Sequence, residues 1–159
     1  MKHMNIVLLT HQREVSKKSN TGSLVADVLG ENASVVIWER KSPNPGVMEE
    51  IEKGTVALLY PTDDSQIVSA ECDFESYIVL DGTWQEAQKI YNKSPYLKKL
   101  PKVKIETATE SIYKLRRNQR PNCLCTAESV IELLRAKGFA ETADELQLKL
   151  LAFVAETGR

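Results

Sequence analysis

Tyr77-Ile78-Val79-Leu80-Asp81-Gly82-Thr83-Trp84 is the stretch of sequence that decides the fold. Its apolar first half predicts a short buried strand over Ser76–Leu80, and the residues that follow predict a helix over Thr83–Asn92. An acid, a glycine, a hydroxyl and a large aromatic side chain therefore crowd one strand-to-helix turn. In open α/β sheets, ligands bind beyond the carboxyl ends of the strands, which makes this turn the first candidate site.

The turn itself allows two interpretations. Thr83 and Glu86 have the spacing of a helix capping box, Asp81-Gly82 is common turn chemistry, and Trp84 can fill space between helix and sheet. An ordinary turn, however, needs neither an acid before the glycine nor a tryptophan after the threonine. A structural role and a chemical role both stay open for these residues.

Strand-like and helix-like segments alternate along the whole chain. The other strands are expected at Asn5–Thr10, Ser34–Trp38 and Thr55–Tyr60, with an edge strand at Lys102–Thr107. The other helices are expected at Asn20–Leu29, Val47–Lys53, Thr126–Lys137 and Ala140–Glu156. This order predicts one α/β domain over residues 1–159, a mainly parallel sheet flanked by helices.

The last two predicted helices are amphipathic, with apolar residues near helical spacing. Packing against the sheet is the favoured interpretation, and a helix that binds a partner or a second copy is the alternative. The apolar positions are Val130, Leu133, Leu134, Leu146, Leu148, Leu150, Leu151 and Phe153.

A chain of 159 residues with 42% hydrophobic and 27% charged residues is typical of a soluble globular domain. Its apolar runs are about five residues long, far short of the roughly 18 that a membrane span needs. The run Ile6–Leu9 is too short for a signal peptide. We expect a cytoplasmic monomer without an obligate protein partner.

Metal and phosphate-loop chemistry find little support in the sequence. The three cysteines, Cys72, Cys123 and Cys125, lack Cys-x-x-Cys spacing, and the chain has only two histidines. We therefore expect free cysteines and no metal. Neither glycine-rich phosphate-binding pattern is present, so a standard dinucleotide or P-loop site is not expected.

Basic residues are concentrated between Lys89 and Arg120. That span holds ten basic residues and two acids, a local charge of +8 in a chain whose net charge is −1. A charge run is usually a solvated helix face, but a block this one-sided favours a surface for a polyanion. A nucleic acid is the expected partner.

Four separated signatures resemble those of the DTW-domain family, in the expected order. They are His11-Gln12-Arg13-Glu14 followed by Ser19-Asn20-Thr21-Gly22; Leu59-Tyr60-Pro61; Asp81-Gly82-Thr83-Trp84 with Ala87; and Tyr113-Lys114-Leu115-Arg116 followed by Cys125-Thr126-Ala127-Glu128. Gln12 stands where a proline is common and Ser129 where an alanine is common. The Cys-rich segment that precedes this region in many relatives is missing.

The resemblance implies a tRNA-uridine aminocarboxypropyltransferase. Members transfer the 3-amino-3-carboxypropyl group of S-adenosylmethionine to N3 of a tRNA uridine and release methylthioadenosine. The resemblance also implies a SPOUT-related fold with a knot in its carboxyl-terminal part. The alternatives are a SPOUT-like RNA methyltransferase, which would donate the methyl group, and a non-catalytic RNA-binding protein.

The resemblance also carries site residues onto this sequence. Asp81, with Thr83 and Trp84, is the candidate catalytic group, either as the base that accepts the N3 proton or as a contact to the ammonium group of the cofactor. Trp84 is a candidate to stack on a base or to pack on the sheet, and Thr83 also suits a helix cap. The predicted cofactor loops contain Leu59, Tyr60, Pro61, Leu80, Gly82, Leu124 and Thr126.

The predicted contacts to substrate or RNA are His11, Arg13, Asn20, Thr21, Gly22, Arg116 and Arg117. The segment at Asn20 opens a helix, whose free N–H groups suit anions, although simple capping explains that residue equally well. The guanidinium groups of Arg116 and Arg117 suit a phosphate or the cofactor carboxylate.

Overall fold

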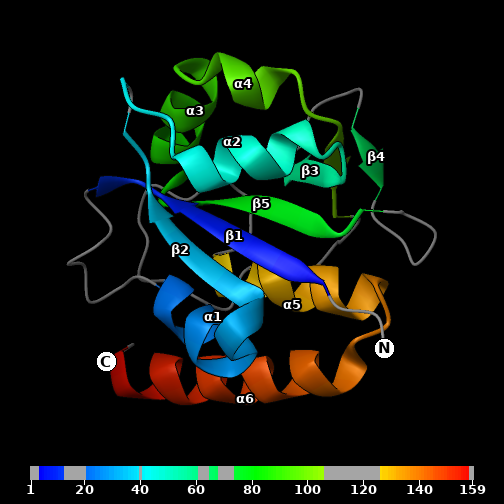
Figure 1. The fold of residues 1–159 in the computed structure, drawn as a ribbon. Helices are drawn as coiled ribbons and strands as arrows, with labels where there is room; N and C mark the ends of the chain where they lie inside the picture. Colours follow the sequence, from blue (N-terminus) through cyan, green and yellow to red (C-terminus); the bar gives the residue numbers. More distant parts are fainter. Residues whose placement is uncertain are drawn as a thin grey trace.

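Six parallel strands form one sheet in the order β2-β1-β5-β3-β6-β4 (Figure 1). The structure is a computed structural model that describes residues 4–12, 21–39, 41–60, 65–67, 74–105 and 126–157. The strands are β1 (Asn5–Thr10), β2 (Ala33–Ile37), β3 (Val56–Leu59), β4 (Gln66–Ile67), β5 (Ser76–Asp81) and β6 (Lys102–Lys104). The parallel sheet predicted from the sequence is confirmed.

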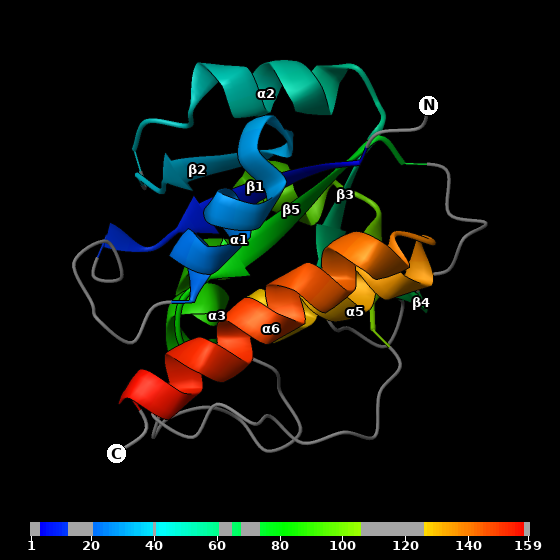
Figure 2. The ribbon, with the colours of Figure 1, turned by 90° about the horizontal axis from the view of Figure 1, so that it is seen from below.

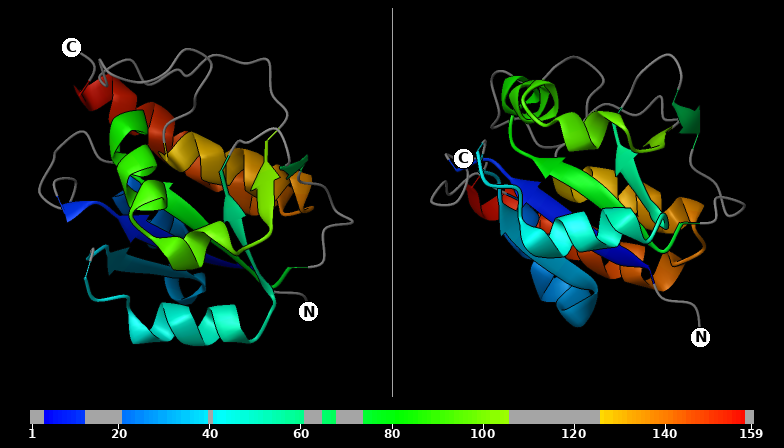
Figure 3. Two further views of the ribbon diagram at one scale, coloured as in Figure 1. Left: turned by 90° about the horizontal axis from the view of Figure 1, so that it is seen from above. Right: turned by 45° about the horizontal axis from the view of Figure 1, so that its top comes forward.

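Helices cover both faces of this sheet. Figures 1 and 3 show α2 (Pro45–Glu52), α3 (Trp84–Asn92) and α4 (Pro95–Lys98) over one face. The other face carries α1 (Gly22–Leu29), which runs into a 3-10 turn at Gly30–Asn32, together with α5 (Thr126–Ala136) and α6 (Ala140–Thr157). Two apolar clusters, one on each side of the sheet, make up the core.

The central strands are buried on both faces, as in other parallel sheets. Every residue of β5 is buried, and in β1 only Asn5 is exposed. Leu8 of β1 packs into the cluster beneath α1 and α5, while Leu9 packs into the cluster beneath α2 and α3. Complete burial of one such side chain stabilises the fold by roughly 1.5–3 kcal/mol, so the central pair β1–β5 anchors the sheet.

The strand predicted at Lys102–Thr107 is present as β6, but its predicted place at the edge of the sheet was wrong. Strand β6 lies between β3 and β4, and Val103 is fully buried there. The two-residue strand β4 forms the edge in its place and was not predicted, because two residues carry no readable periodicity. The short helix α4, which starts at a Pro after Ser94, was also missed.

Helix α6 forms an outer layer over α1 and α5, rather than packing directly on the sheet as predicted (Figure 2). Leu146 and Leu150 point into the core, but Leu148 and Leu151 are exposed. The helical spacing therefore identified the element correctly and misassigned two of its apolar positions.

The three cysteines lie outside the described part of the chain, and the knot in the carboxyl-terminal part stays a prediction. Within the described part, no helix is long and apolar enough to cross a membrane.

Candidate active site at the carboxyl edge of the sheet

The centre of the sheet contains a topological switch point between β1 and β5. These two strands are neighbours, with Thr10 beside Asp81 at their carboxyl ends. The helix that follows β1 in the chain, α1, covers one face, whereas α3 follows β5 onto the other face (Figure 1). Diverging connections of this kind open a crevice beyond the strand ends, which is where open parallel sheets bind ligands.

Asp81 is the last residue of β5 and occupies this switch point. Its carboxylate is buried, with 2% of the residue exposed. Oδ1 accepts a hydrogen bond of 2.8 Å from the Thr126 hydroxyl, and Oδ2 lies 3.2 Å from the Thr10 hydroxyl, which lies equally close to the carbonyl oxygen of Leu8. Asp81 therefore ends β5, one residue beyond the predicted end of this strand, and joins β1, β5 and α5.

Thr83 and Glu86 form the capping box that the sequence predicted. The Thr83 hydroxyl accepts from the Glu86 N–H at 3.1 Å, and Glu86 Oε1 accepts from the Thr83 N–H at 2.9 Å. This reciprocal pair satisfies N–H groups that the start of α3 leaves without helical partners. The cap fixes where α3 begins relative to Asp81, two residues earlier in the chain.

His11 lies beside this cap, one residue after β1. Its backbone N–H donates to the Asp81 carbonyl oxygen at 3.1 Å, and its Nδ1 lies 3.7 Å from Glu86 Oε2. The imidazole is buried and tilted against the Trp38 ring, with 5.9 Å between ring centroids. Trp38 Nε1 in turn donates to the Ser94 hydroxyl at 2.8 Å, which fixes the indole.

Thr21 connects the first predicted motif to the last one. It is fully buried, and its hydroxyl accepts from the Ala127 N–H at the start of α5 at 3.0 Å. It supplies no side-chain cap to its own helix α1. This contact gives Thr21 a role inside the protein, instead of the exposed position that direct contact with RNA requires.

Tyr60 is connected through Tyr91 to two lysines of α4 and β6. It follows β3 directly and is buried, and its ring stacks on Tyr91 of α3 with 4.2 Å between centroids. The Lys98 and Lys102 ammonium groups lie 5.9 and 5.5 Å from the Tyr91 centroid. These distances are typical of cation–π contacts.

One perturbed pKa is found near this aromatic group. Burial raises the pKa of Tyr96 on α4 above its usual value of 10.0, while a hydrogen bond with Ser94 acts in the opposite direction. Tyr96 is half-buried, and its partner Ser94 also accepts the hydrogen bond from the Trp38 indole.

The described parts of the predicted site meet at one edge of the sheet. Asp81, Gly82 and Thr83 lie at the end of β5, Leu59 and Tyr60 end the adjacent β3, Leu80 lies within β5, and Thr126 reaches Asp81 directly. Gly22 begins α1 and is buried. Trp84 begins α3, but its side chain is outside the described part. Also outside it are Arg13, Asn20, Pro61, Arg116, Arg117 and Leu124.

The sequence interpretation missed Thr10, Trp38 and the second contact of Glu86. Thr10 carried the one available signal, since it is a hydroxyl that follows four apolar residues of the same strand. Glu86 was read only as a cap, because the three-residue spacing to Thr83 explains it without any distant partner. No group of three or more His, Cys, Asp or Glu side chains suited to a metal occurs among the described residues.

The structure places a buried carboxylate at the switch point of an open parallel sheet, which is where proteins of this architecture bind their ligands. Residues 1–157 match the DTW domain. The chain therefore belongs to the DTW-domain family.

Two curated relatives carry the same name. The chain is 29% identical over 137 residues to tRNA-uridine aminocarboxypropyltransferase 2 of Drosophila melanogaster, covering 81% of this chain and 54% of the relative. It is 26% identical over 132 residues to tRNA-uridine aminocarboxypropyltransferase 2 of Macaca fascicularis, covering 78% and 44%. The chain thus spans about half the length of these relatives.

A solved structure shares the fold. The SAM-dependent rRNA:acp-transferase Tsr3 from Vulcanisaeta distributa superposes with a TM-score of 0.63 at 17% identity, over 98% of this chain and 79% of that one. At this identity the similarity shows the common fold.

Proposed function

We propose that this protein transfers the 3-amino-3-carboxypropyl group of S-adenosylmethionine to N3 of a uridine in tRNA, releasing methylthioadenosine. The observation that carries the proposal is the buried Asp81 carboxylate at the switch point, inside the Asp-x-Thr-Trp motif of its family. The names of both curated relatives and the fold shared with an acp-transferase support it.

The donor set at the sheet edge suits this cofactor. S-adenosylmethionine supplies a carbon activated by the positive charge of its sulfonium. Asp81 holds a buried carboxylate at the end of β5, and Tyr60 follows the adjacent strand β3 with its ring buried and stacked on Tyr91. A carboxylate at this place can face the ammonium group of the cofactor or accept the uridine N3 proton, and we assign Asp81 the second role.

Asp81 is the proposed acceptor of the proton on uridine N3. A carboxylate within hydrogen-bond reach removes that proton as attack develops, which contributes roughly 10²–10⁴-fold to the rate. Thr126 and Thr10 orient the carboxylate, because a buried acceptor held by two hydroxyls has little freedom to rotate. The main contribution of the protein is then to hold both reactants in line.

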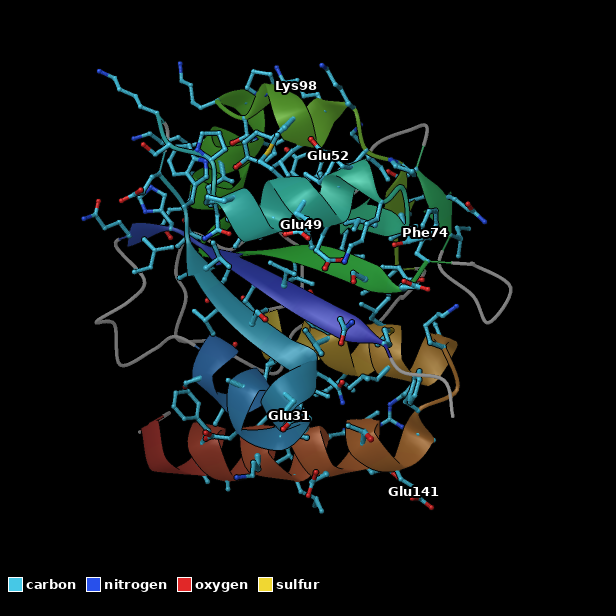
Figure 4. All side chains as sticks on the ribbon, in the orientation of Figure 1. Glu31, Glu49, Glu52, Phe74, Lys98 and Glu141 are labelled. Carbon is cyan, nitrogen blue, oxygen red and sulfur yellow. The ribbon has the colours of Figure 1, made fainter. Side chains whose placement is uncertain are left out.

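The basic surface on α3, α4 and β6 is the proposed contact for tRNA phosphates. Between residues 82 and 105 the single acid is the buried Glu86, while six lysines are exposed or half-buried: Lys89, Lys93, Lys98, Lys99, Lys102 and Lys104. Figure 4 shows Lys98 on the outer side of α4, far from Glu141 on α6.

Salt dependence tests the phosphate contacts. Neutralising one lysine, as in Lys98→Ala, is expected to weaken tRNA binding and to reduce the dependence of log affinity on log salt by about one. Lys149→Ala, an exposed lysine on α6 across the sheet, is the matched control and should leave both unchanged. Binding that does not respond to salt would contradict the assignment.

Nucleoside mass spectrometry after incubation with bulk tRNA and S-adenosylmethionine tests the activity. An added aminocarboxypropyl group on uridine supports the proposal, whereas an added methyl group identifies an RNA methyltransferase. Failure to bind S-adenosylmethionine in calorimetry, with tRNA binding intact, would identify a non-catalytic RNA-binding protein.

A further inference from the structure

Glu86 makes two different contacts with one carboxylate. Oε1 closes the cap of α3 through the Thr83 N–H at 2.9 Å, and Oε2 lies 3.7 Å from His11 Nδ1. The Glu86 and His11 side chains are only 10% and 8% exposed. Capping uses one oxygen and works equally well with an exposed glutamate, so the buried pairing with His11 calls for a separate explanation.

Several elements hold His11 in place. Its backbone N–H donates to the Asp81 carbonyl oxygen, which extends the β1–β5 pairing by one step. Its ring lies against Trp38, which is itself fixed by the hydrogen bond to Ser94. The imidazole is therefore built into the switch point beside the Asp81 turn.

The charged side chains described around His11 are acidic. Glu86 faces it from α3, and Asp81 lies next to it on β5, with a carboxylate that accepts from Thr126. From the end of β2 comes the uncharged indole of Trp38, followed in the chain by the exposed Glu39. A buried carboxylate is stable only when it is paired, and an opposite charge within about 4 Å favours the imidazolium.

We propose that Glu86 is a positioning residue that holds His11 as a positively charged hydrogen-bond donor to an oxygen of the uridine nucleotide. The inference rests on the proposed function, which makes that nucleotide the substrate. When N3 loses its proton, negative charge spreads onto the two carbonyl oxygens of uracil. A fixed, charged donor stabilises such developing charge.

One carboxylate thereby sets the position of His11 relative to the catalytic turn. Glu86 ties the cap of α3, and with it the Asp81–Thr83 turn, to the residue that follows β1. Displacing a group in a site by about 1 Å can cost on the order of 10²-fold in rate.

Glu86→Gln separates the two roles. Glutamine also serves at this place of a capping box, so the helix start is retained while the charge that faces His11 is lost. Glu52→Gln makes the same chemical change at an exposed position of α2 and is the matched control. Circular dichroism and the midpoint of thermal unfolding should be close to wild type for both variants.

Proton NMR tests the pairing of Glu86 with His11 without any catalytic assay. The chain contains only two histidines, so the His11 imidazole signal can be followed with His3 as an internal reference. In Glu86→Gln, the His11 titration midpoint should fall, because the opposite charge that favours the imidazolium is lost, and the midpoint of His3 should not move. An unchanged His11 midpoint would overturn the proposal.

Kinetic measurements test how the pairing of Glu86 with His11 affects the reaction rate. Glu86→Gln should lower the single-turnover rate roughly 10–100-fold, with the Kd for S-adenosylmethionine within a few-fold of wild type. The wild-type rate should fall as pH rises through the His11 midpoint, and that fall should begin at lower pH in the variant. The double variant with His11→Gln should be no slower than His11→Gln alone, because the two residues act as one unit.

Additive losses in the double variant, or a Glu86→Gln rate equal to wild type, would leave Glu86 as a helix cap and refute the proposal. If wild-type protein transfers nothing to tRNA, the proposed function fails. The NMR titration then still decides whether Glu86 holds His11 in the charged form.

Discussion

Helices α3 and α5 begin at the same edge of the sheet, on opposite faces, but their first turns are held in different ways. The start of α3 is closed by Thr83 and Glu86, which are three residues apart in the chain. The start of α5 depends on remote partners, since Ala127 donates to Thr21 and Thr126 donates to Asp81. The start of α3 is held by residues close together in the sequence, whereas the start of α5 is held by residues that meet only once the sheet has assembled.

This difference shows how the candidate site acquires its rigidity. Asp81 lies between the two helix starts, joined to α5 by its side chain and to α3 by the chain itself. Local capping fixes the turn after Asp81, and the long-range contacts fix the carboxylate. Both are needed to present an acidic group in one orientation, as catalysis by positioning requires.

The largest expected effect comes from Asp81→Asn, which removes the negative charge that lies between the two helix starts. The amide oxygen still accepts from Thr126 and the amide nitrogen can donate to Thr10, so folding should survive. The single-turnover rate of uridine modification at saturating cofactor should fall about 10²–10⁴-fold. Glu52→Gln serves as control, and a rate within a few-fold of wild type would show that Asp81 only shapes the site.

Thr126→Val removes one of the long-range contacts at the start of α5. Valine keeps the shape of threonine but removes the donor to buried Asp81 Oδ1, which should lower the free energy of unfolding by roughly 1–3 kcal/mol. Thr126→Ser retains the hydroxyl and should lose much less. Urea unfolding followed by circular dichroism checks both variants, and equal stability of Thr126→Val and wild type would argue against this contact.

Thr83→Ala removes one of the two hydrogen bonds of the local cap at the start of α3. Loss of the side-chain acceptor should cost about 1 kcal/mol, while the bond from the Thr83 N–H to Glu86 remains. Thr83→Ser restores the acceptor and is the control. If urea unfolding instead shows Thr83→Ala to be more damaging than Thr126→Val, the distinction between local and remote support is wrong.

The smallest expected effect concerns the packing on the α3 side, through Tyr96. Because burial raises the pKa of Tyr96, the unfolded chain loses this proton at a lower pH than the folded protein does. The contribution to stability is therefore constant below about pH 10 and declines as pH rises further. Urea unfolding at a series of pH values should show a shallower decline for Tyr96→Phe than for wild type, and identical curves would contradict the assignment.

The DTW motifs and the alternation of elements identified the family and the parallel sheet, with most boundaries within one or two residues. The capping box was also readable, because its two partners lie three residues apart and a helix start satisfies its own N–H groups locally. Strand β4 and the place of β6 were not readable, since short strands owe their position to neighbours that periodicity does not encode.

What the sequence determined by itself is the set of chemical groups and the local elements that carry them, including Asp81 in a strand-to-helix turn and Thr83 at the start of a helix. The tertiary structure alone decided which groups meet. Thr10 and Thr126 are separated from Asp81 by 71 and 45 residues, and His11 meets Glu86 across the switch point. These contacts follow from the order of strands and the faces on which their helices cross, and neither is written in any short stretch of sequence.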